Sequence, residues 1–225
     1  MKNFWFVTGT DTNVGKTTCS ILLLMLAKNL GYHTAGYKPV AFGYNSCNKK
    51  NNDALLLQRF STVKLNYTEV NPFLFSEFIS PNIENKKSFN PICTNILSSG
   101  LHNLKKKSNY ILIEGAGGWN TPLSNKITLA DWVIQEKLNV ILVIGIKLGC
   151  INHAILTQKA ILDAKLFFSG WIANYTTPEN EYNSEYILIL KKYLKSKFLG
   201  IVKYSHCLDT LYNSKITVQL PLIKN

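Results

Sequence analysis

The sequence predicts a single α/β domain with a mostly parallel sheet and helices on both faces. Short apolar runs alternate with longer helical segments, as expected for strands joined by helical crossovers. A glycine-bearing loop stands between the first apolar run, 4–8, and the first helical segment, 17–30. Polar side chains follow several apolar runs, and a parallel sheet would place these side chains along one edge. A chain of 225 residues with 46% hydrophobic content is long enough for one such domain.

The elements are expected in a regular order. Short apolar runs predict strands, and longer segments with helical spacing predict helices. Gly31 is suited to the end of the first helix, and the prolines of 66–90 predict a loop with short pieces of structure. No repeat or linker interrupts the order, so 1–225 is expected to be one domain. The predicted strands are 4–8, 33–40, 110–114, 140–146, 168–174 and 199–203, and the predicted helices are 17–30, 53–60, 91–106, 152–164 and 181–197.

The loop 9–17 reads Gly-Thr-Asp-Thr-Asn-Val-Gly-Lys-Thr. A strand, a loop ending Gly-Lys-Thr and a helix form the arrangement that binds a nucleoside triphosphate. Backbone N–H groups and the helix N-terminus attract the phosphates, Lys16 would reach the outer phosphates, and Thr17 would offer its hydroxyl to magnesium. The sequence therefore predicts a P-loop NTPase fold. Gly9 stands one position before the usual first glycine, and Asp11 stands where partition-type ATPases carry an extra lysine, which argues against that branch.

Three further residues are candidates for the same site. Glu114 ends an apolar strand before a run of glycines, where P-loop enzymes place the second metal partner; a solvated acid in a glycine turn is the alternative. Asp53 begins a predicted helix, and N-capping alone explains an aspartate there. Lys38 lies at a strand end beside Pro39, where a lysine is commonly solvated.

Composition bears on partners and location. The net charge of +12 is compatible with nucleic-acid binding. However, Arg59 is the only arginine and the lysines are scattered, a bias that AT-rich coding produces, so no nucleic-acid partner is expected. No apolar run approaches the roughly 18 residues of a membrane helix. Removal of a signal peptide would destroy the phosphate loop, so a cytoplasmic protein is expected. Five scattered cysteines suggest neither a disulfide framework nor a metal site.

Four stretches of the sequence resemble dethiobiotin synthetase. They are 6–17, 36–40, 114–119 and 147–154, with smaller matches at 53–55 and 170–174. The stretches occur in the order found in that family, and the resemblance covers nearly the whole chain, fading after about Gly200.

The resemblance implies the penultimate step of biotin synthesis. One amine of 7,8-diaminononanoate (diaminopelargonate) takes up CO2 to form a carbamate. ATP phosphorylates the carbamate to a carbamic–phosphoric anhydride. The second amine then closes the cyclic urea and releases phosphate. The enzyme would be a ligase with Mg2+ as cofactor and ATP as co-substrate, and it would work as a homodimer.

The resemblance also implies roles for residues. Lys38, Lys16 and Thr12 would be catalytic, and Thr17, Asp53 and Glu114 would hold Mg2+. The segment Leu148–Asn152 would bind the substrate carboxylate across the dimer interface, with Asn152 also opening the following helix. The expected nucleotide and metal contacts are Asn13, Val14, Gly15, Lys16, Thr17, Thr18, Asp53, Glu114, Gly115, Ala116, Gly117, Asn174 and Tyr175, with Asn174 at the adenine edge. The expected substrate contacts are Thr12, Lys38, Phe42, Gly117, Gly118, Leu148, Gly149, Cys150, Ile151 and Asn152.

The chain departs from the family pattern at three positions. Phe42 replaces a small serine that contacts substrate, and Tyr175 and Lys203 replace residues near the adenine and ribose. These departures predict altered affinity with the chemistry retained. The sequence does not show whether 209–225 folds over the nucleotide.

Three other functions are alternatives to this assignment. A cobyrinate amidase-like ligase would need a glutaminase domain, for which 225 residues leave no room. A non-catalytic nucleotide switch would not need Lys38. An inactive relative is suggested by Phe42 and the lysine-rich composition.

Overall fold

A computed structural model of the protein describes residues 3–75, 92–207, 210, 212 and 217–221. The strands of its main sheet are β1 (Phe4–Gly9), β2 (Thr34–Tyr37), β5 (Tyr110–Glu114), β6 (Asn139–Gly145), β7 (Phe168–Asn174) and β8 (Phe198–Val202). All neighbouring strands pair in parallel, in the order β2-β5-β1-β6-β7-β8. The predicted α/β class with a parallel sheet is confirmed.

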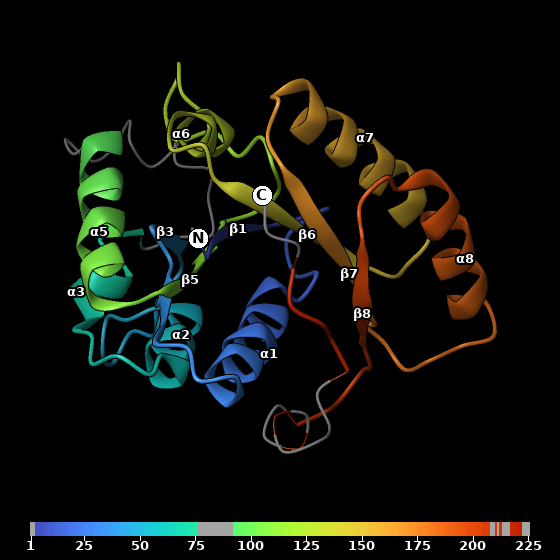
Figure 1. Ribbon diagram of the computed structural model, residues 1–225, viewed down its shortest axis with the longest axis horizontal. Coiled ribbons are helices and arrows are strands. Elements are labelled where there is room, and N and C mark those ends of the chain that lie inside the picture. The colour runs from blue at the N-terminus through green and yellow to red at the C-terminus, as the bar shows by residue number, and fades with distance from the viewer. Residues whose placement is uncertain (1–2, 76–91, 208–209, 211, 213–216, 222–225) are drawn as a thin grey trace.

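Helices lie on both faces of this sheet (Figure 1). In the view of Figure 1, α1 and α2 lie below the sheet, and α6 and α7 lie above it. The helices in the described residues are α1 (Lys16–Asn29), α2 (Asn52–Phe60), α3 (Tyr67–Val70), α5 (Thr94–Lys107), α6 (Leu129–Gln135), α7 (Cys150–Asp163) and α8 (Asn183–Tyr193). None of the helices within these residues has the length and apolar character needed to cross a membrane.

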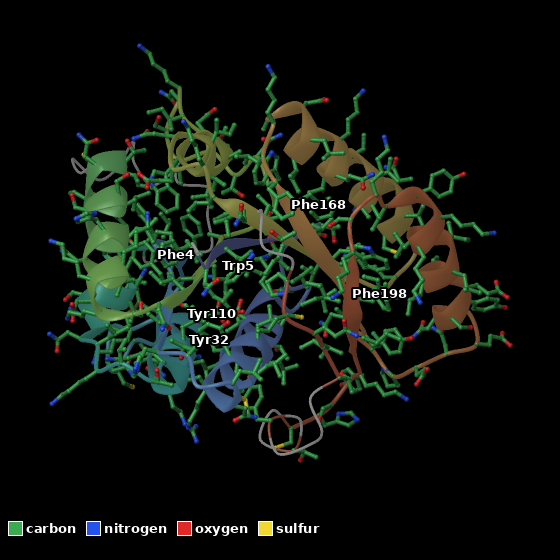
Figure 2. All side chains as sticks on the ribbon, viewed as in Figure 1. Phe4, Trp5, Tyr32, Tyr110, Phe168 and Phe198 are labelled. Atoms are coloured by element: carbon green, nitrogen blue, oxygen red, sulfur yellow. The ribbon has the colours of Figure 1, made fainter. Side chains whose placement is uncertain are left out.

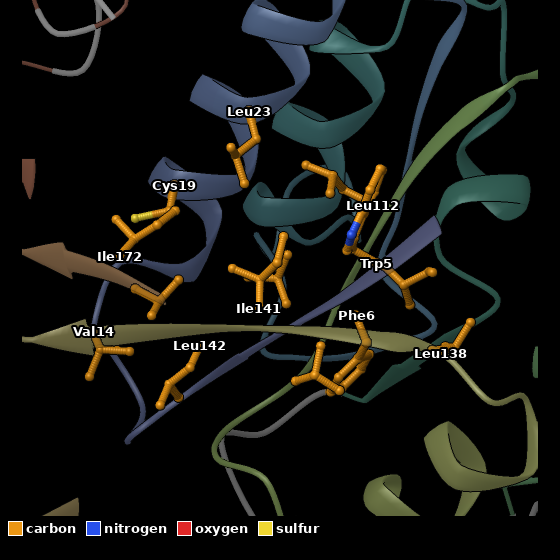
Figure 3. Packing of buried hydrophobic residues seen from close by; sticks show 14 of the residues in the cluster. Trp5, Phe6, Val14, Cys19, Leu23, Leu112, Leu138, Ile141, Leu142 and Ile172 are labelled. Carbon is orange, nitrogen blue, oxygen red and sulfur yellow. The ribbon is translucent and has the colours of Figure 1, made fainter. Parts of the chain in front are cut away.

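Alternate residues of the central strands pack on opposite faces of the sheet. Trp5 and Ile141 point toward Leu23 of α1, whereas the next residues along each strand, Phe6 and Leu142, point to the other side (Figure 3). All five side chains are at most 1% exposed. Because both faces of β1 and β6 are covered, these strands are continuous apolar runs rather than alternating ones.

Aromatic side chains gather at the amino ends of the strands. Trp5 at the start of β1 lies 4.9 Å, centroid to centroid, from Tyr110 at the start of β5, and Tyr32 lies 5.4 Å from Tyr110. Figure 2 labels this group and also Phe168 and Phe198, which begin β7 and β8. Apolar packing therefore closes one end of the sheet, and the carboxyl end is left for polar residues.

The predicted strand 33–40 is wrong in its second half. β2 ends at Tyr37, and the chain leaves the main sheet to form β3 (Val40–Phe42), which pairs in parallel with β4 (Phe73–Phe75). Pro39 has no N–H to continue the ladder, while its carbonyl accepts from Phe73 N at 3.3 Å. Because β2 ends at Tyr37, Lys38 lies just beyond the carboxyl end of this strand.

Other helix boundaries also differ from expectation. α7 begins at Cys150, so Asn152 does not open it; Gly149, at φ 87°, is the N-cap. α8 spans Asn183–Tyr193, shorter than the predicted 181–197. The short elements α6, α3 and β4 were not individually predicted, although short structure was expected in 66–90. Of the predicted loop 66–90 and helix 91–106, residues 76–91 lie outside the described residues.

Candidate active site

Polar residues from three adjacent strands meet at the carboxyl edge of the sheet. Lys16 and Thr17 follow β1, Glu114 ends β5 and Lys38 follows β2, and these strands are neighbours in the order β2-β5-β1. A cavity of about 330 Å³ opens at this edge. It is lined by Thr12, Asn13, Gly15, Lys16, Thr17, Thr18, Lys38, Phe42, Asp53, Leu56, Glu114, Ala116, Gly117 and Tyr212.

The phosphate loop presents an open helix N-terminus to this cavity. Gly15 is the N-cap of α1 at φ 85°, a left-handed conformation that favours glycine. Among the described residues no side chain caps the helix, and its first turn holds no acidic residue. The first N–H groups of α1 are thus available to an anion.

Lys16 is buried at the N-terminus of that helix. Its Nζ donates to the Asp11 carbonyl at 2.9 Å. Burial and the neighbouring Lys38 ammonium lower the pKa of Lys16 to about 8. A bound phosphate would raise the pKa of Lys16, because its negative charge favours the protonated amine.

Lys38 forms a buried ion pair with Glu114. Lys38 Nζ lies 2.6 Å from Glu114 Oε1 and 3.4 Å from Asp53 Oδ2, and it also donates to the Gly115 carbonyl at 3.1 Å. Burial alone would lower the pKa of Lys38, but the Glu114 and Asp53 carboxylates outweigh it and raise the pKa. Lys38 is therefore a fixed cation in the wall of the cavity, not a solvated lysine.

Asn71 holds the backbone beside Lys38, a contact that sequence reasoning missed. Its Nδ2 donates to the Lys38 carbonyl at 2.7 Å, and Lys38 N donates to the Val70 carbonyl at 2.8 Å. Asn71 is 3% exposed. The pattern Asn-Pro in the sequence indicates only a turn, so it carried no signal for this role.

Asp53 is not the cap of α2. Asn51 is the N-cap, and its side chain accepts from Ala54 N at 3.1 Å. The alternative that Asp53 merely caps the helix is therefore wrong. Asp53 lies in the first turn, with its side chain 43% exposed and turned toward Lys38.

The oxygens next to Thr17 have the chemistry of a magnesium site. Glu114 Oε1 accepts from Thr17 Oγ1 at 2.7 Å, whereas Glu114 Oε2 is buried with no hydrogen-bond partner among the described residues. A buried carboxylate oxygen without a partner is costly unless a further ligand satisfies it. Hydroxyl and carboxylate oxygens are the donors that Mg2+ prefers. Elsewhere in the part of the chain that the structure describes, no cluster of three or more His, Cys, Asp or Glu side chains could hold a metal ion.

Part of the cavity wall is apolar. Phe42 ends β3 and stacks on Phe75 at 5.5 Å between ring centroids. Leu56 of α2 and Tyr212 also line the cavity, and Tyr212 packs on Phe60 at 4.9 Å. Leu56 and Tyr212 were not predicted, because neither belongs to a recognisable motif. Tyr212 brings part of the 209–225 segment to the site.

A second cavity lies beside the first. It has a volume of about 170 Å³, and Asn13 and Thr18 line both cavities. Asn174 and Tyr175, expected at the adenine, line only the second cavity. The other residues of its wall are Thr176, Val202, Lys203, Tyr204 and Ser205.

Some expected contacts lie outside the two cavities. Leu148 is 88% exposed, and none of Leu148–Asn152 lines either cavity of this chain. The segment is nevertheless tied to the phosphate loop, because Lys147 Nζ lies 3.1 Å from Asp11 Oδ2. Val14, Gly115 and Gly118 are near the site without lining it, and an added Cβ on Gly118 would lie 3.7 Å from the Gly9 carbonyl oxygen.

Comparison with known proteins gives full-length relatives. A protein-family model described as "AAA domain" matches residues 4–210. An ATP-dependent dethiobiotin synthetase of Buchnera aphidicola subsp. Baizongia pistaciae is 56% identical over 225 residues, covering 99% of each chain. The ATP-dependent dethiobiotin synthetase BioD 1 of Escherichia coli strain K12 is 48% identical over 206 residues, covering 91% of this chain and 92% of its own.

Solved structures support the fold alone. The MinC:MinD cell division protein complex of Aquifex aeolicus matches with a TM-score of 0.56 at 13% identity, covering 94% of this chain and 85% of that chain. At this identity the shared sheet and helices carry no information on substrate. By the identity and coverage of the full-length relatives, the chain belongs to the ATP-dependent dethiobiotin synthetase family.

Proposed function

We propose that the protein catalyses the ATP-dependent closure of 7,8-diaminononanoate and CO2 to dethiobiotin, the penultimate step of biotin synthesis. The observation that carries the proposal is the meeting of two lysines, Thr17 and two carboxylates at one cavity. The full-length relatives named dethiobiotin synthetase support the choice of reaction.

The chemistry has three steps. One amine of the substrate adds to CO2 and loses a proton, which gives a carbamate. A carbamate oxygen then attacks the γ-phosphorus of ATP, and ADP leaves. The second amine attacks the carbonyl carbon of the resulting anhydride, phosphate leaves with the C–O bond electrons, and the nitrogen loses a proton as the C–N bond of the urea ring forms.

The cavity's own residues suit the phosphoryl transfer. Such transfers depend on alignment and charge neutralisation more than on covalent help. Lys16 would hold the outer phosphates, and Lys38 would hold the anionic carbamate against the γ-phosphate. Thr12 and the backbone of Gly117 and Gly118 would orient the carbamate.

Magnesium and the adenine of ATP would bind in neighbouring positions. Thr17, Asp53 and Glu114 would hold Mg2+, which would neutralise charge on the phosphates when bound. Asn174 and Tyr175 would receive the adenine in the second cavity, which adjoins the phosphate loop.

A homodimer would complete the substrate site. Leu148 and Asn152 are exposed and line neither cavity of this chain, whereas Cys150 between them is buried. We propose that Leu148–Asn152 enter the partner's site and bind the substrate carboxylate there.

Phosphate release tests the reaction. We expect release only when ATP, the diamine and bicarbonate are all present, and we expect Lys16→Ala to abolish it, because the charge directed at the phosphates is lost. Release without the diamine would favour a nucleotide switch, and no release under any condition would favour an inactive relative. Near-normal turnover of Lys16→Ala would contradict the assignment of the phosphate loop.

A further inference from the structure

The side chain of Asn174 crosses from the end of β7 to the phosphate loop. Its Nδ2 donates to the Val14 carbonyl at 2.9 Å, and the residue is 6% exposed. An ideal Cβ added to Gly15 would lie 2.1 Å from Nδ2 but 3.5 Å from Oδ1. The nitrogen end of the amide therefore faces the loop, directly over the Gly15 backbone.

Val14 is fixed at its other end by the hydrophobic core. Its side chain is 1% exposed and points into the packed residues near Leu142 (Figure 3). An added Cβ on Gly145 of β6 would lie 3.0 Å from Val14 Cγ1. The side chain of Val14 thus anchors the loop to the sheet, and the hydrogen bond from Asn174 sets the direction of the Val14 carbonyl.

The direction of this carbonyl matters for phosphate binding. The Val14 carbonyl and the Gly15 N–H belong to one planar trans peptide, so they point in opposite directions. No cis peptide bond occurs among the described residues. When the carbonyl is held toward Asn174, the Gly15 N–H is held away from Asn174, and Gly15 lines the first cavity.

We propose that Asn174 is a positioning residue for the phosphate loop, in addition to its place in the second cavity. It fixes the peptide between Val14 and Gly15 so that this N–H is available to the phosphates before nucleotide binds. The inference rests on the proposed function, because it assumes that triphosphate binds at this loop. Asn174 also links the two cavities, since its side chain lines the second cavity and fixes the backbone at Gly15, which lines the first.

Inorganic triphosphate, which has no base, separates loop positioning from base recognition. Asn174→Ala removes the donor, and Asn174→Leu removes it while nearly keeping the volume. Both variants should bind magnesium triphosphate about three- to tenfold more weakly than wild type, the loss expected for one neutral hydrogen bond. They should lose more affinity for ATP, because base contacts are lost as well. Titration calorimetry measures both ligands.

Tyr204→Ala is the matched control. Tyr204 lines the second cavity, and no hydrogen bond joins it to the phosphate loop among the contacts of the described residues. This variant should weaken ATP binding and leave triphosphate binding unchanged. If Asn174→Ala behaves in the same way, Asn174 serves base recognition alone and the inference is overturned. If the wild-type protein binds neither ligand, the proposed function fails, and the inference fails with it.

Amide hydrogen exchange of the ligand-free protein gives a second readout. Loss of the Asn174 bond should speed exchange of the backbone amides in the loop 10–15 and leave α5, on a distant part of the fold, unchanged. Unchanged exchange in the loop of a folded Asn174→Ala variant would also overturn the inference. Faster exchange throughout the protein would mean that Asn174 only supports the fold, which contradicts the positioning role.

Discussion

Lys16 makes nucleotide binding sensitive to pH. Burial and Lys38 lower its pKa to about 8, so the free protein loses this charge at mildly alkaline pH. Because ATP binds the protonated amine, the affinity for ATP should fall about tenfold between roughly pH 7 and pH 9. Lys38 keeps its charge over this range, since its pKa is raised. Titration calorimetry across the range measures the effect.

Stability provides the control for this prediction, because its sign is opposite. A lysine whose pKa is lower in the folded protein disfavours folding when it is charged. The contribution of Lys16 to stability should therefore improve as pH rises from about 8 toward its ordinary value of 10.5. Weaker ATP binding at high pH would thus not be caused by a loss of protein stability that comes from Lys16. An equally steep pH dependence in Lys16→Met would show that another group is responsible.

Phe42 is expected to change substrate affinity rather than chemistry. A hydrogen bond from a serine hydroxyl to the substrate is worth about 0.5–1.5 kcal/mol. Phe42 instead offers an apolar ring, which stacks on Phe75. Phe42→Ser should lower the KM for the diamine by about tenfold or less and leave kcat and the KM for ATP nearly unchanged. Steady-state kinetics measures all three. A change in kcat of several orders of magnitude would mean that Phe42 positions the reacting groups.

Individual residues also show the limits of sequence reasoning. Lys16, Thr17 and Glu114 were found because a motif or a strand end marks them. The environment of Lys38 depends on residues that are distant in sequence, because its partner Glu114 lies 76 residues away along the chain. Leu56 and Tyr212 join the site through packing, and Asn71 joins it through a hydrogen bond to the Lys38 carbonyl, and no local sequence pattern encodes either kind of contact. Asp53 was ambiguous until Asn51 proved to be the cap.

The two expected carboxylate ligands of the metal differ in burial. Glu114 belongs to β5, whose residues are all buried, whereas Asp53 lies in the first turn of α2 with a half-exposed side chain. Removing one partner from a buried ion pair costs about 3–5 kcal/mol, and removing an exposed one costs about 1 kcal/mol or less. Glu114→Gln should therefore destabilise the protein strongly in denaturant unfolding, and Asp53→Asn only slightly.

Both substitutions should also raise the magnesium concentration needed for tight ATP binding, because each removes a carboxylate oxygen near Thr17. Asp53→Asn is the cleaner of the two, since its fold is expected to survive. Calorimetric titration of ATP at several magnesium concentrations tests this. A magnesium dependence of Asp53→Asn equal to that of wild type would remove Asp53 from the metal site.

Element types were easier to predict than their ends. β5 and β7 match their predicted bounds, because each is mostly apolar and ends at a polar residue, although β7 also contains Ser169. The strand 33–40 failed at Pro39, where a missing N–H diverted the chain into a second sheet. α6 has seven residues and was missed, although the capping box of Thr128 and Asp131 marks its start. α7 begins earlier than expected because Gly149 accepts a left-handed conformation.

At the scale of the molecule, the parallel sheet explains how scattered residues form one site. Residues 16, 38, 114 and 174 are far apart in sequence, but all follow or end strands at the same edge. The fold alone does not determine the reaction, because a cell division protein with 13% identity shares it. We expect the reaction to depend on the particular side chains placed along that edge.

The dimer is a prediction about the whole molecule. Leu148 is 88% exposed and Leu156 of α7 is 57% exposed, and we expect a second subunit to cover Leu148. If each active site takes Lys38 from one chain and Asn152 from the other, two variants that each fail should restore one another. Lys38→Ala disables the site in its own chain, whereas Asn152→Asp places a negative charge against the substrate carboxylate in its partner's site.

Mixing the two variants under conditions that exchange subunits should therefore restore activity at low diamine concentration. Random pairing makes about half of the dimers mixed, and each mixed dimer has one intact site, so about a quarter of wild-type activity is expected. Sedimentation measures the assembly state in the same samples. A mixture that stays as inactive as its components would place Asn152 in its own chain's site, and a fully active monomer at micromolar concentration would reject the shared site altogether.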